Sequence, residues 1–386
     1  MNYEEIYISN KQHKLLGRYV HLEHIEPMLN DLNDKLQLSI VGYSVLSKPI
    51  YSYKIGHGKI KILMWSQMHG NESTTTKAIF DFINLLKSNS LLATEYLENY
   101  TFNIIPILNP DAAELYTREN ANGIDLNRDF KNLLQPESNF LMQVFNDFNP
   151  DYCYNMHDQR TIYGTGIDNK PATVSFLAPS FNENCDFNEN RTQAAAVIVA
   201  INEVLQQFIP EQVGRFDDAH NDNCAGDTFQ KLGKPTILFE AGHFPDDYDR
   251  DITRKYIFFG LIASFNFIFS NTKNVNSIVE YQQIPQNKVC FFDIIYKNVR
   301  IVKNNTNINA TFAIQFDEII EINQIAFKGV ICEIEKLENF RGHIEIDGNN
   351  ELFTIYENRH FPEIGDVANF KIGNLSIING KLSVFQ

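Results

Sequence analysis

Short apolar runs alternate with amphipathic stretches over residues 1–270. The runs with the length and composition of buried strands are Ile60–Trp65, Thr101–Ile107, Tyr152–Met156 and Thr236–Glu240. The stretches with helical periodicity are Thr75–Lys87, Ser138–Phe148, Asn190–Phe208 and Asp249–Ser270. Strands that alternate with helices are typical of a central sheet covered by helices on both faces. The pattern therefore predicts a three-layer α/β/α fold with a mixed, mostly parallel sheet.

The last third of the chain has a different hydrophobic pattern. A polar segment, Asn271–Ser277, predicts a linker. Beyond it, Ile, Phe and Val recur in short alternating runs such as Ile294–Val302, and turn signals such as Asn379-Gly380 separate the runs. We therefore expect an α/β domain over residues 1–270 and a small all-β accessory domain over residues 278–386. The second domain carries no sequence signal for a function of its own.

The charge of the chain argues against nucleic acids and anionic membranes as partners, and its hydropathy argues against a membrane-spanning segment and a secretory signal. Its 386 residues have a formal net charge of −15. Nucleic acids and anionic membrane surfaces are bound by clustered cationic side chains, so we expect neither as a partner. The most apolar long run, Tyr256–Phe269, is shorter than the roughly 20 residues that cross a bilayer. The acidic segment Met1–Glu5 lacks the apolar core of a secretory signal.

The cysteines indicate a reducing compartment. There are five of them, widely scattered, and no two form a Cys-x-x-Cys pair. An odd number without metal-binding spacing argues against both a disulfide framework and a cysteine zinc site. We therefore expect reduced thiols and a cytoplasmic location.

Candidate chemistry begins at a strand-to-helix turn. The apolar strand that ends at Trp65 is followed by His69 and, three residues later, by Glu72. Open α/β folds bind ligands at such turns, and a His and a Glu at this spacing are able to face one cation. The pair alone is weak support, because His360 and Glu363 form a second copy in the predicted β domain. A proline separates that second pair and no later histidine follows it, so we expect it to bind no metal.

Two further apolar strands end in polar groups. One is followed directly by His157, and another ends in Glu240. Ionisable groups beside an apolar core are costly and are usually reserved for a site. Together with Arg118 and Arg128, which are suited to binding a carboxylate, these groups predict a metal hydrolase that acts on an anionic substrate.

The order and wording of five segments resemble the zinc carboxypeptidase family over about residues 40–265. The segments are His69-Gly-Asn-Glu72, Asn109-Pro-Asp111, Thr117–Phe130, the strand-end His157 and the strand-end Glu240. Five ordered motifs are far more specific than any one of them. The resemblance implies the same α/β/α fold and a zinc-dependent metallocarboxypeptidase, which hydrolyses the C-terminal amide bond of peptides.

The resemblance also implies a role for each matched residue. His69, Glu72 and His157 would bind one zinc ion per chain, and three protein ligands leave open the position that catalytic zinc uses for water. Glu240 would act as the general base and acid that moves a proton from water to the leaving amine. Arg118 would polarise the scissile carbonyl and stabilise the oxyanion.

Two more matched residues imply the substrate's chemistry. Asn127 and Arg128 would hold a terminal carboxylate, for which a planar guanidinium supplies two parallel hydrogen bonds. The implied partner is therefore a peptide with a free C-terminal carboxylate. Well-known family members carry a substrate-capping tyrosine before the catalytic glutamate, but Val213–Lys234 contains none. Tyr163, in the Gly-rich loop after His157, is the candidate to replace it as a substrate-binding residue.

Three hypotheses on function follow. The first is a zinc carboxypeptidase of short peptides, and the 85-residue spacing from Glu72 to His157 is closer to the bacterial branch that trims cell-wall peptides. The second is a zinc-dependent N-acyl amino acid deacylase of the succinylglutamate desuccinylase or aspartoacylase type, which shares the HGNE and DLNRxF wording. The third is a catalytically silent relative that binds peptide ends. Retention of all seven matched residues argues against it.

Overall fold

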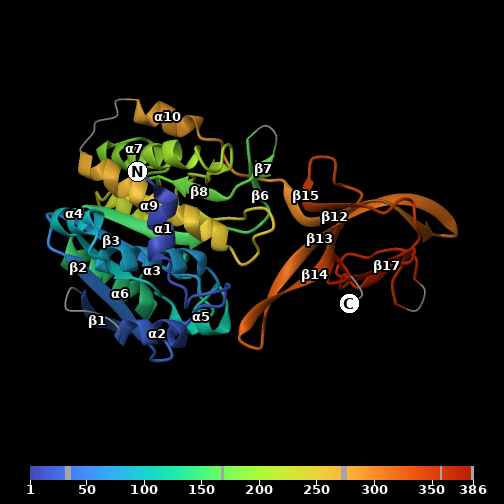
Figure 1. Ribbon diagram of the computed structural model, residues 1–386, viewed down its shortest axis with the longest axis horizontal. Coiled ribbons are helices and arrows are strands. Elements are labelled where there is room, and N and C mark those ends of the chain that lie inside the picture. The colour runs from blue at the N-terminus through green and yellow to red at the C-terminus, as the bar shows by residue number, and fades with distance from the viewer. Residues whose placement is uncertain (31–35, 167–168, 271–275, 357–358, 384–386) are drawn as a thin grey trace. The chain divides into compact units, whose positions relative to one another are not determined.

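The computed structural model describes residues 1–30, 36–166, 169–270, 276–356 and 359–383 (Figure 1). The chain divides into two compact units. The first unit comprises Met1–Gln159 and Ala172–Asn287, and the second comprises Arg160–Pro171 and Lys288–Gln386.

This division differs from the predicted domains in two places. Residues 276–287, with helix α10 (Ser277–Gln283), group with the first unit and not with the second. Residues 160–171 interrupt the first unit in sequence but group with the second. Residues 271–275 of the predicted linker lie outside the described residues.

An eight-stranded sheet forms the centre of the first unit, in the order β1-β2-β4-β3-β5-β10-β8-β9. Its strands are β1 (Leu36–Tyr43), β2 (Pro49–Gly56), β3 (Ile60–Ser66), β4 (Tyr100–Ile105), β5 (Tyr152–Asp158), β8 (Val174–Leu177), β9 (Val213–Arg215) and β10 (Thr236–Ala241). The four central strands β4, β3, β5 and β10 run parallel, whereas β1, β2 and β8 pair with their inner neighbours antiparallel. The predicted mixed sheet with a parallel centre is confirmed.

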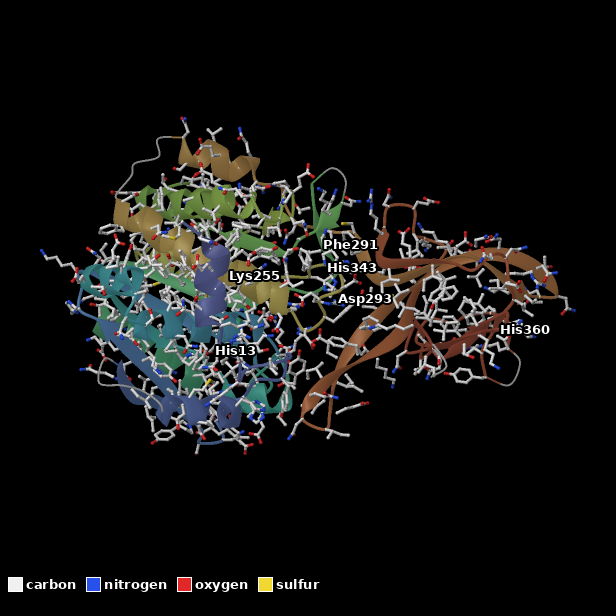
Figure 2. The ribbon with its side chains drawn as sticks, in the orientation of Figure 1. His13, Lys255, Phe291, Asp293, His343 and His360 are labelled. Carbon is white, nitrogen blue, oxygen red and sulfur yellow. The ribbon has the colours of Figure 1, made fainter. Side chains whose placement is uncertain are left out.

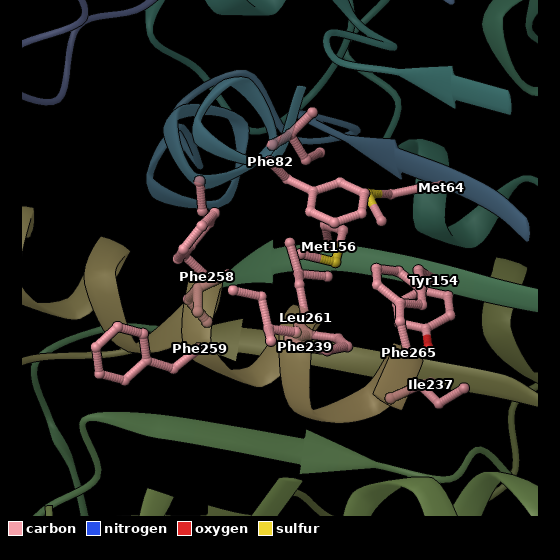
Figure 3. Close-up of a cluster of buried hydrophobic side chains, with 14 of the residues drawn as sticks. Met64, Phe82, Tyr154, Met156, Ile237, Phe239, Phe258, Phe259, Leu261 and Phe265 are labelled. Atoms are coloured by element: carbon pink, nitrogen blue, oxygen red, sulfur yellow. The ribbon is translucent and has the colours of Figure 1, made fainter. Parts of the chain in front are cut away.

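Helices cover both faces of this sheet. They are α1 (Tyr3–Asn10), α2 (Leu22–Asn30), α3 (Thr74–Lys87), α4 (Leu91–Asn99), α5 (Pro110–Leu115), α6 (Pro136–Phe148), α7 (Glu189–Leu205), α8 (Ala225–Lys231), α9 (Asp251–Ser270) and α10. In β3, Ile62 and Met64 belong to a core shared with α3, α7 and α9. Figure 3 shows part of this core, with Met64 near Phe82 of α3 and side chains of α9. Leu63 and Trp65 belong to a second core shared with α6 and α8. Because the strand is buried on both faces, it appears in the sequence as a continuous apolar run.

Helix α9 is a core helix. Among the described residues it alone has the length and hydropathy of a membrane-spanning helix, but 72% of its most apolar window is buried inside the protein. Its side chains Phe258, Leu261 and Phe265 pack in the first core (Figure 3).

The second unit is built from strands, as predicted. They are β6 (Tyr163–Thr165), β7 (Lys170–Pro171), β11 (Lys288–Val289), β12 (Phe291–Lys303), β13 (Thr306–Glu321), β14 (Gln324–Ile334), β15 (Arg341–Asp347), β16 (Phe353–Thr354), β17 (Phe370–Ile372), β18 (Leu375–Ile378) and β19 (Lys381–Leu382). They form three sheets, in the orders β11-β6-β7, β14-β13-β12-β15 and β16-β17-β18-β19. An aromatic cluster of Tyr296, Phe312, Phe353 and Phe370 fills part of the core.

A buried ion pair joins α3 to α9 in the first unit. Arg254 donates from Nε to Asp81 Oδ2 at 2.6 Å and from Nη2 to Asp81 Oδ1 at 2.5 Å. The same guanidinium donates to the carbonyl oxygens of Leu15 and Gln12 at 2.8 and 2.9 Å. Both charged side chains are fully buried. Each charge therefore depends on its partner for the solvation that it loses on folding.

Replacing Asp81 with alanine should remove the two-point partner of the buried Arg254 charge and leave it only the longer contact with Asp251, at 3.8 Å. We expect the free energy of unfolding of the first unit to fall by about 3 kcal/mol. Urea unfolding followed by tryptophan fluorescence measures this change, because the chain's single tryptophan, Trp65, is buried in this unit. Lys231→Ala removes an exposed ion pair with Asp222 and serves as the control, with an expected loss below about 1 kcal/mol. Equal losses in the two variants would contradict the prediction.

Candidate metal centre

His69 and Glu72 lie in the tight turn that follows β3. At this turn the backbone packs closely against the backbone of α5. The backbone N–H of Glu72 donates to the carbonyl oxygen of His69 at 3.2 Å, which closes the turn just before α3 begins. A Cβ atom at Gly70 would lie 2.0 Å from the carbonyl carbon of Ala112. Only glycine fits at this position.

Three side chains converge beyond the turn. His69 Nδ1 lies 2.8 Å from Glu72 Oε1, and His157 Nδ1 lies 2.7 Å from Glu72 Oε2. The two Nδ1 atoms are 3.2 Å apart. One ligand atom from each residue lies within 4.8 Å of the others, and all three side chains are buried. The structure therefore brings together the three residues that the sequence analysis singled out as metal ligands.

The chemistry of this cluster fits a zinc ion. Two imidazole nitrogens and a carboxylate facing one point are a ligand set of catalytic zinc, with a fourth position left for water. Burial disfavours a charged Glu72, but the nearby His69 and His157 outweigh burial and hold the pKa of Glu72 well below its usual range. Burial is also the main cause that lowers the pKa of His157. An ionised carboxylate and a neutral imidazole are the forms that bind metals.

Asp125 orients the first ligand. Its Oδ1 lies 2.9 Å from Nε2 of His69, so the other ring nitrogen, Nδ1, faces the ligand cluster. Asp125 also accepts hydrogen bonds from Nε of Arg118 at 3.1 Å and from the backbone N–H of Asn127 at 2.8 Å. Burial alone would raise the pKa of Asp125, but His69 and Arg118 outweigh burial and lower the pKa.

Asp158 connects the second ligand strand to α3. Its backbone N–H donates to Glu72 Oε2 at 3.1 Å. Its carboxylate accepts from the backbone N–H groups of Thr74 and Thr75, at 3.0 and 3.3 Å, in the first turn of α3. A carboxylate at a helix N-terminus satisfies free N–H groups and is favoured by the helix dipole. Asp158 therefore fixes Glu72 relative to the end of β5.

The predicted substrate-side residues are Arg118, Asn127 and Arg128. Asn127 and Arg128 lie in a short 3₁₀ helix, Leu126–Arg128, and Arg118 lies in the segment before it. Arg118 donates to Glu72 Oε1 at 3.2 Å and remains 42% exposed, so its guanidinium borders the ligand cluster and solvent. Asn127 Oδ1 accepts from the backbone N–H of Ala225 at 2.9 Å. The exposed Arg128 donates to the carbonyl oxygen of Asn127 at 2.7 Å and lies 3.2 Å from Cys224 Sγ.

Glu240 lies beside the second histidine ligand in the sheet. Parallel pairing of β10 with β5 places Glu240 opposite His157. Burial is the main cause that raises the pKa of Glu240 well above its usual range, and the negative charges of Glu72 and Asp158 add to it. A carboxyl group with a raised pKa is able to carry a proton near neutral pH. A cation bound nearby would lower this pKa again.

Three residues from the sequence analysis belong to the second unit. Tyr163 is in β6, which groups with the second unit, so its role as a substrate cap stays a prediction. His360, labelled in Figure 2, is in the second unit and lies 3.1 Å from the carbonyl oxygen of Phe353 through Nδ1. Glu363 pairs with Arg359. Within the described residues, His360 and Glu363 are not part of a metal-compatible cluster.

Similarity to known proteins covers the first part of this site. Residues 22–161 match the family model described as zinc carboxypeptidase. Carboxypeptidase SOL1 of Arabidopsis thaliana is 28% identical over 157 residues, which are 35% of this chain and 32% of that protein. Carboxypeptidase E of Caenorhabditis elegans is 28% identical over 168 residues, 34% of this chain and 36% of that protein. The chain therefore spans about a third of the length of these two relatives.

The fold resembles that of a solved enzyme. A metallo-carboxypeptidase from Burkholderia cenocepacia superposes with a TM-score of 0.52 and 16% identity, over 65% of this chain and 70% of that chain. At this identity the likeness concerns the fold alone. Together with the family match, it confirms the resemblance to zinc carboxypeptidases, and the predicted zinc cofactor agrees with the ligand cluster. The family match ends before Glu240.

Zinc binding should depend on His157 and not on the second His-Glu pair. We expect the wild-type protein to bind one zinc ion. His157→Ala should weaken zinc binding by more than the roughly 10- to 100-fold typical of losing an outer-shell partner, because a direct ligand is lost. Mass spectrometry of bound metals and competition with a chelating dye measure stoichiometry and affinity. His360→Ala is the control, and a similar loss in both variants would refute the assignment.

Proposed function

We propose that the protein is a zinc-dependent carboxypeptidase that hydrolyses the C-terminal amide bond of short peptides. The observation that carries the proposal is the convergence of His69, Glu72 and His157, with Glu240 opposite His157 in the sheet. A zinc ion in this position would supply Lewis-acid polarisation and would lower the pKa of water.

Glu240 is the proposed general base and acid. It would take a proton from the attacking water and then give it to the amine that leaves. This role requires a carboxyl group whose pKa is close to the working pH, and general catalysis of this kind accelerates reactions by about 10²- to 10⁴-fold. The burial of Glu240 and its acidic neighbours supply the upward shift, and the positive charges of Arg118 and Arg250 limit it.

Arg118 is the proposed stabiliser of the oxyanion. Its hydrogen bonds to Glu72 and Asp125 fix the guanidinium, and its exposed part is able to donate to an oxygen at which negative charge develops. No reorganisation is then needed during the reaction, which is what makes a preset donor effective.

Arg128, with Asn127, is the proposed binding site for the substrate's terminal carboxylate. Arg128 is exposed, and its hydrogen bonds within the described part of the chain go to a carbonyl oxygen and a thiol, which are weaker partners than a carboxylate. The whole chain carries a net charge of −15, so the exposed Arg128 offers a positive charge to an anionic group within an acidic protein. Cell-wall-derived peptides are one candidate source of substrate, and a cytoplasmic location remains a prediction.

Glu240→Gln should retain zinc and lose turnover. The amide keeps the size of the side chain but is unable to accept the proton, so kcat should fall by about 10³-fold. Hydrolysis of peptides and metal content are measured on the same preparations. Glu203→Gln, an exposed position on α7, is the matched control and should have wild-type activity. Undiminished turnover in Glu240→Gln would refute the proposed mechanism.

Substrate choice should separate a carboxypeptidase from an N-acyl amino acid deacylase. We expect release of C-terminal amino acids from a library of short peptides, and little hydrolysis of N-acetyl or N-succinyl amino acids at equal concentration. Peptides with an amidated C-terminus should be poor substrates, because they do not offer a carboxylate to Arg128. Preferred hydrolysis of the acylated amino acids would favour the deacylase.

A further inference from the structure

The chain crosses between the two units three times, after Gln159, after Pro171 and after Asn287. Gln159 comes two residues after His157, just beyond the carboxyl end of β5. One crossing is therefore adjacent in sequence to a proposed metal ligand.

The side chain of Gln159 joins the first-unit residues at all three crossings. Its Nε2 donates to the carbonyl oxygen of Ala172 at 2.8 Å, and its Oε1 accepts from Nδ2 of Asn287 at 2.7 Å. Ser175 Oγ completes the group, because it lies 3.0 Å from Gln159 Nε2 and donates to Asn287 Oδ1 at 2.9 Å. Gln159 is 5% exposed, so water does not compete strongly for these bonds.

Two glycines make room for this group. A Cβ atom at Gly242 would lie 2.0 Å from the carbonyl oxygen of Ala172 and 2.6 Å from Gln159 Nε2. A Cβ atom at Gly214 would lie 1.9 Å from Asn287 Oδ1. The amide groups are therefore enclosed by backbone on both sides, which leaves them little freedom to move.

The backbone of Gln159 leads to the proposed metal ligands. Its N–H donates to the carbonyl oxygen of Ala241 at 2.8 Å, and its carbonyl oxygen accepts from Nη2 of Arg250 at 2.7 Å. Arg250 Nη1 donates to the same Ala241 oxygen at 2.7 Å and lies 3.7 Å from Asp158 Oδ2. Asp158 in turn donates its N–H to Glu72. Buried hydrogen bonds and one ion pair at 3.7 Å, between Arg250 and Asp158, therefore connect Gln159 to Glu72.

The second unit holds the segment that follows Gln159 with bonds of its own. The carbonyl oxygen of Ile162 accepts from the backbone N–H of Phe291 at 3.1 Å. Thr161 accepts at its carbonyl oxygen from Nε2 of His343 and at Oγ1 from Nε2 of Gln315, both at 2.8 Å. His343 stacks on Phe291 with ring centroids 4.5 Å apart, and both are labelled in Figure 2. Thr161 and Ile162, which follow the first crossing, are therefore held within the second unit by hydrogen bonds of that unit.

We propose that Gln159 is a positioning residue of the metal centre. It ties the three crossings together and thereby holds the end of β5, so that His157 and, through Asp158, Glu72 stay in ligating positions. The proposal rests on the proposed function, because it assumes that a metal ion occupies this centre. Since Gln159 acts through the ligands and not on the substrate, its loss should lower metal affinity and kcat and leave KM nearly unchanged.

The test compares Gln159→Met, Asn287→Ala and the double variant in the full chain. Methionine keeps the volume of the side chain and removes all three hydrogen bonds of the amide, to Ala172, Ser175 and Asn287. Each single variant should change the visible absorption spectrum of the cobalt-substituted protein and weaken zinc binding by about tenfold. Both substitutions break the hydrogen bond between residues 159 and 287. The double variant should therefore bind zinc no more weakly than the single variant with the lower zinc affinity. At saturating zinc, kcat should fall about tenfold.

The control is Asp81→Ala, which destabilises the first unit without touching these bonds. Its cobalt spectrum and its kcat should equal those of the wild type at a temperature where it is folded. A folded Gln159→Met protein with the wild-type cobalt spectrum and zinc affinity would overturn the proposal, as would additive losses in the double variant. Asn287→Ala provides the same test from the other end of the bond if Gln159→Met does not fold. The metal measurements need no turnover, so an absence of peptide cleavage would refute the proposed function and not this inference.

Discussion

The parallel alignment of β3, β5 and β10 is the constraint on which the candidate site depends. Parallel neighbours end at the same edge of a sheet, so residues at or just beyond their carboxyl ends gather there. His69 follows β3, while His157 and Glu240 occupy paired positions near the ends of β5 and β10. An antiparallel strand in any of these places would carry its ionisable group to the opposite edge. The parallel strand order thus brings His69, His157 and Glu240, which are far apart in sequence, to one edge of the sheet.

Ionisable groups at a buried edge of the sheet lose their contact with water. Hydrogen bonds and ion pairs among these groups offset part of that desolvation cost. Glu72 contacts both histidines, Arg118 and one backbone N–H. Asp158 lies at the N-terminus of α3 and near Arg250. Each partner offsets part of the desolvation cost that an isolated charge would have there. The same contacts hold the side chains of Glu72 and Asp158 in one orientation. One set of contacts therefore both replaces lost solvation and fixes the geometry of the site.

The hydrophobic pattern predicts the long buried elements well, because burial on both faces gives β3, β5 and β10 continuous apolar runs. It misses the β1–β2 hairpin, whose outer strand is largely exposed, and short helices such as α5 that carry too few turns for a periodic signal. Motif order predicts which side chains converge. It does not reveal that Asp125 orients His69, although the aspartate lies within a quoted motif, because that contact depends on tertiary geometry. The pairing of β6 with β11 joins segments that are distant in sequence, and neither strand carries a local signal for its partner.

The grouping of residues 160–171 with the second unit also sets an order on folding. During synthesis the short strand β6 leaves the ribosome long before β11 and β12, so its edge must wait for partners that are made later. Contacts between segments so distant in sequence form late, since the loop between them has to close first. A nascent chain that stops before residue 288 would contain every side chain proposed for catalysis. It would still lack β11, the strand that pairs with β6. The segment that follows the carboxyl end of β5 therefore completes its strand pairing only after residues 288 and 289 have been made.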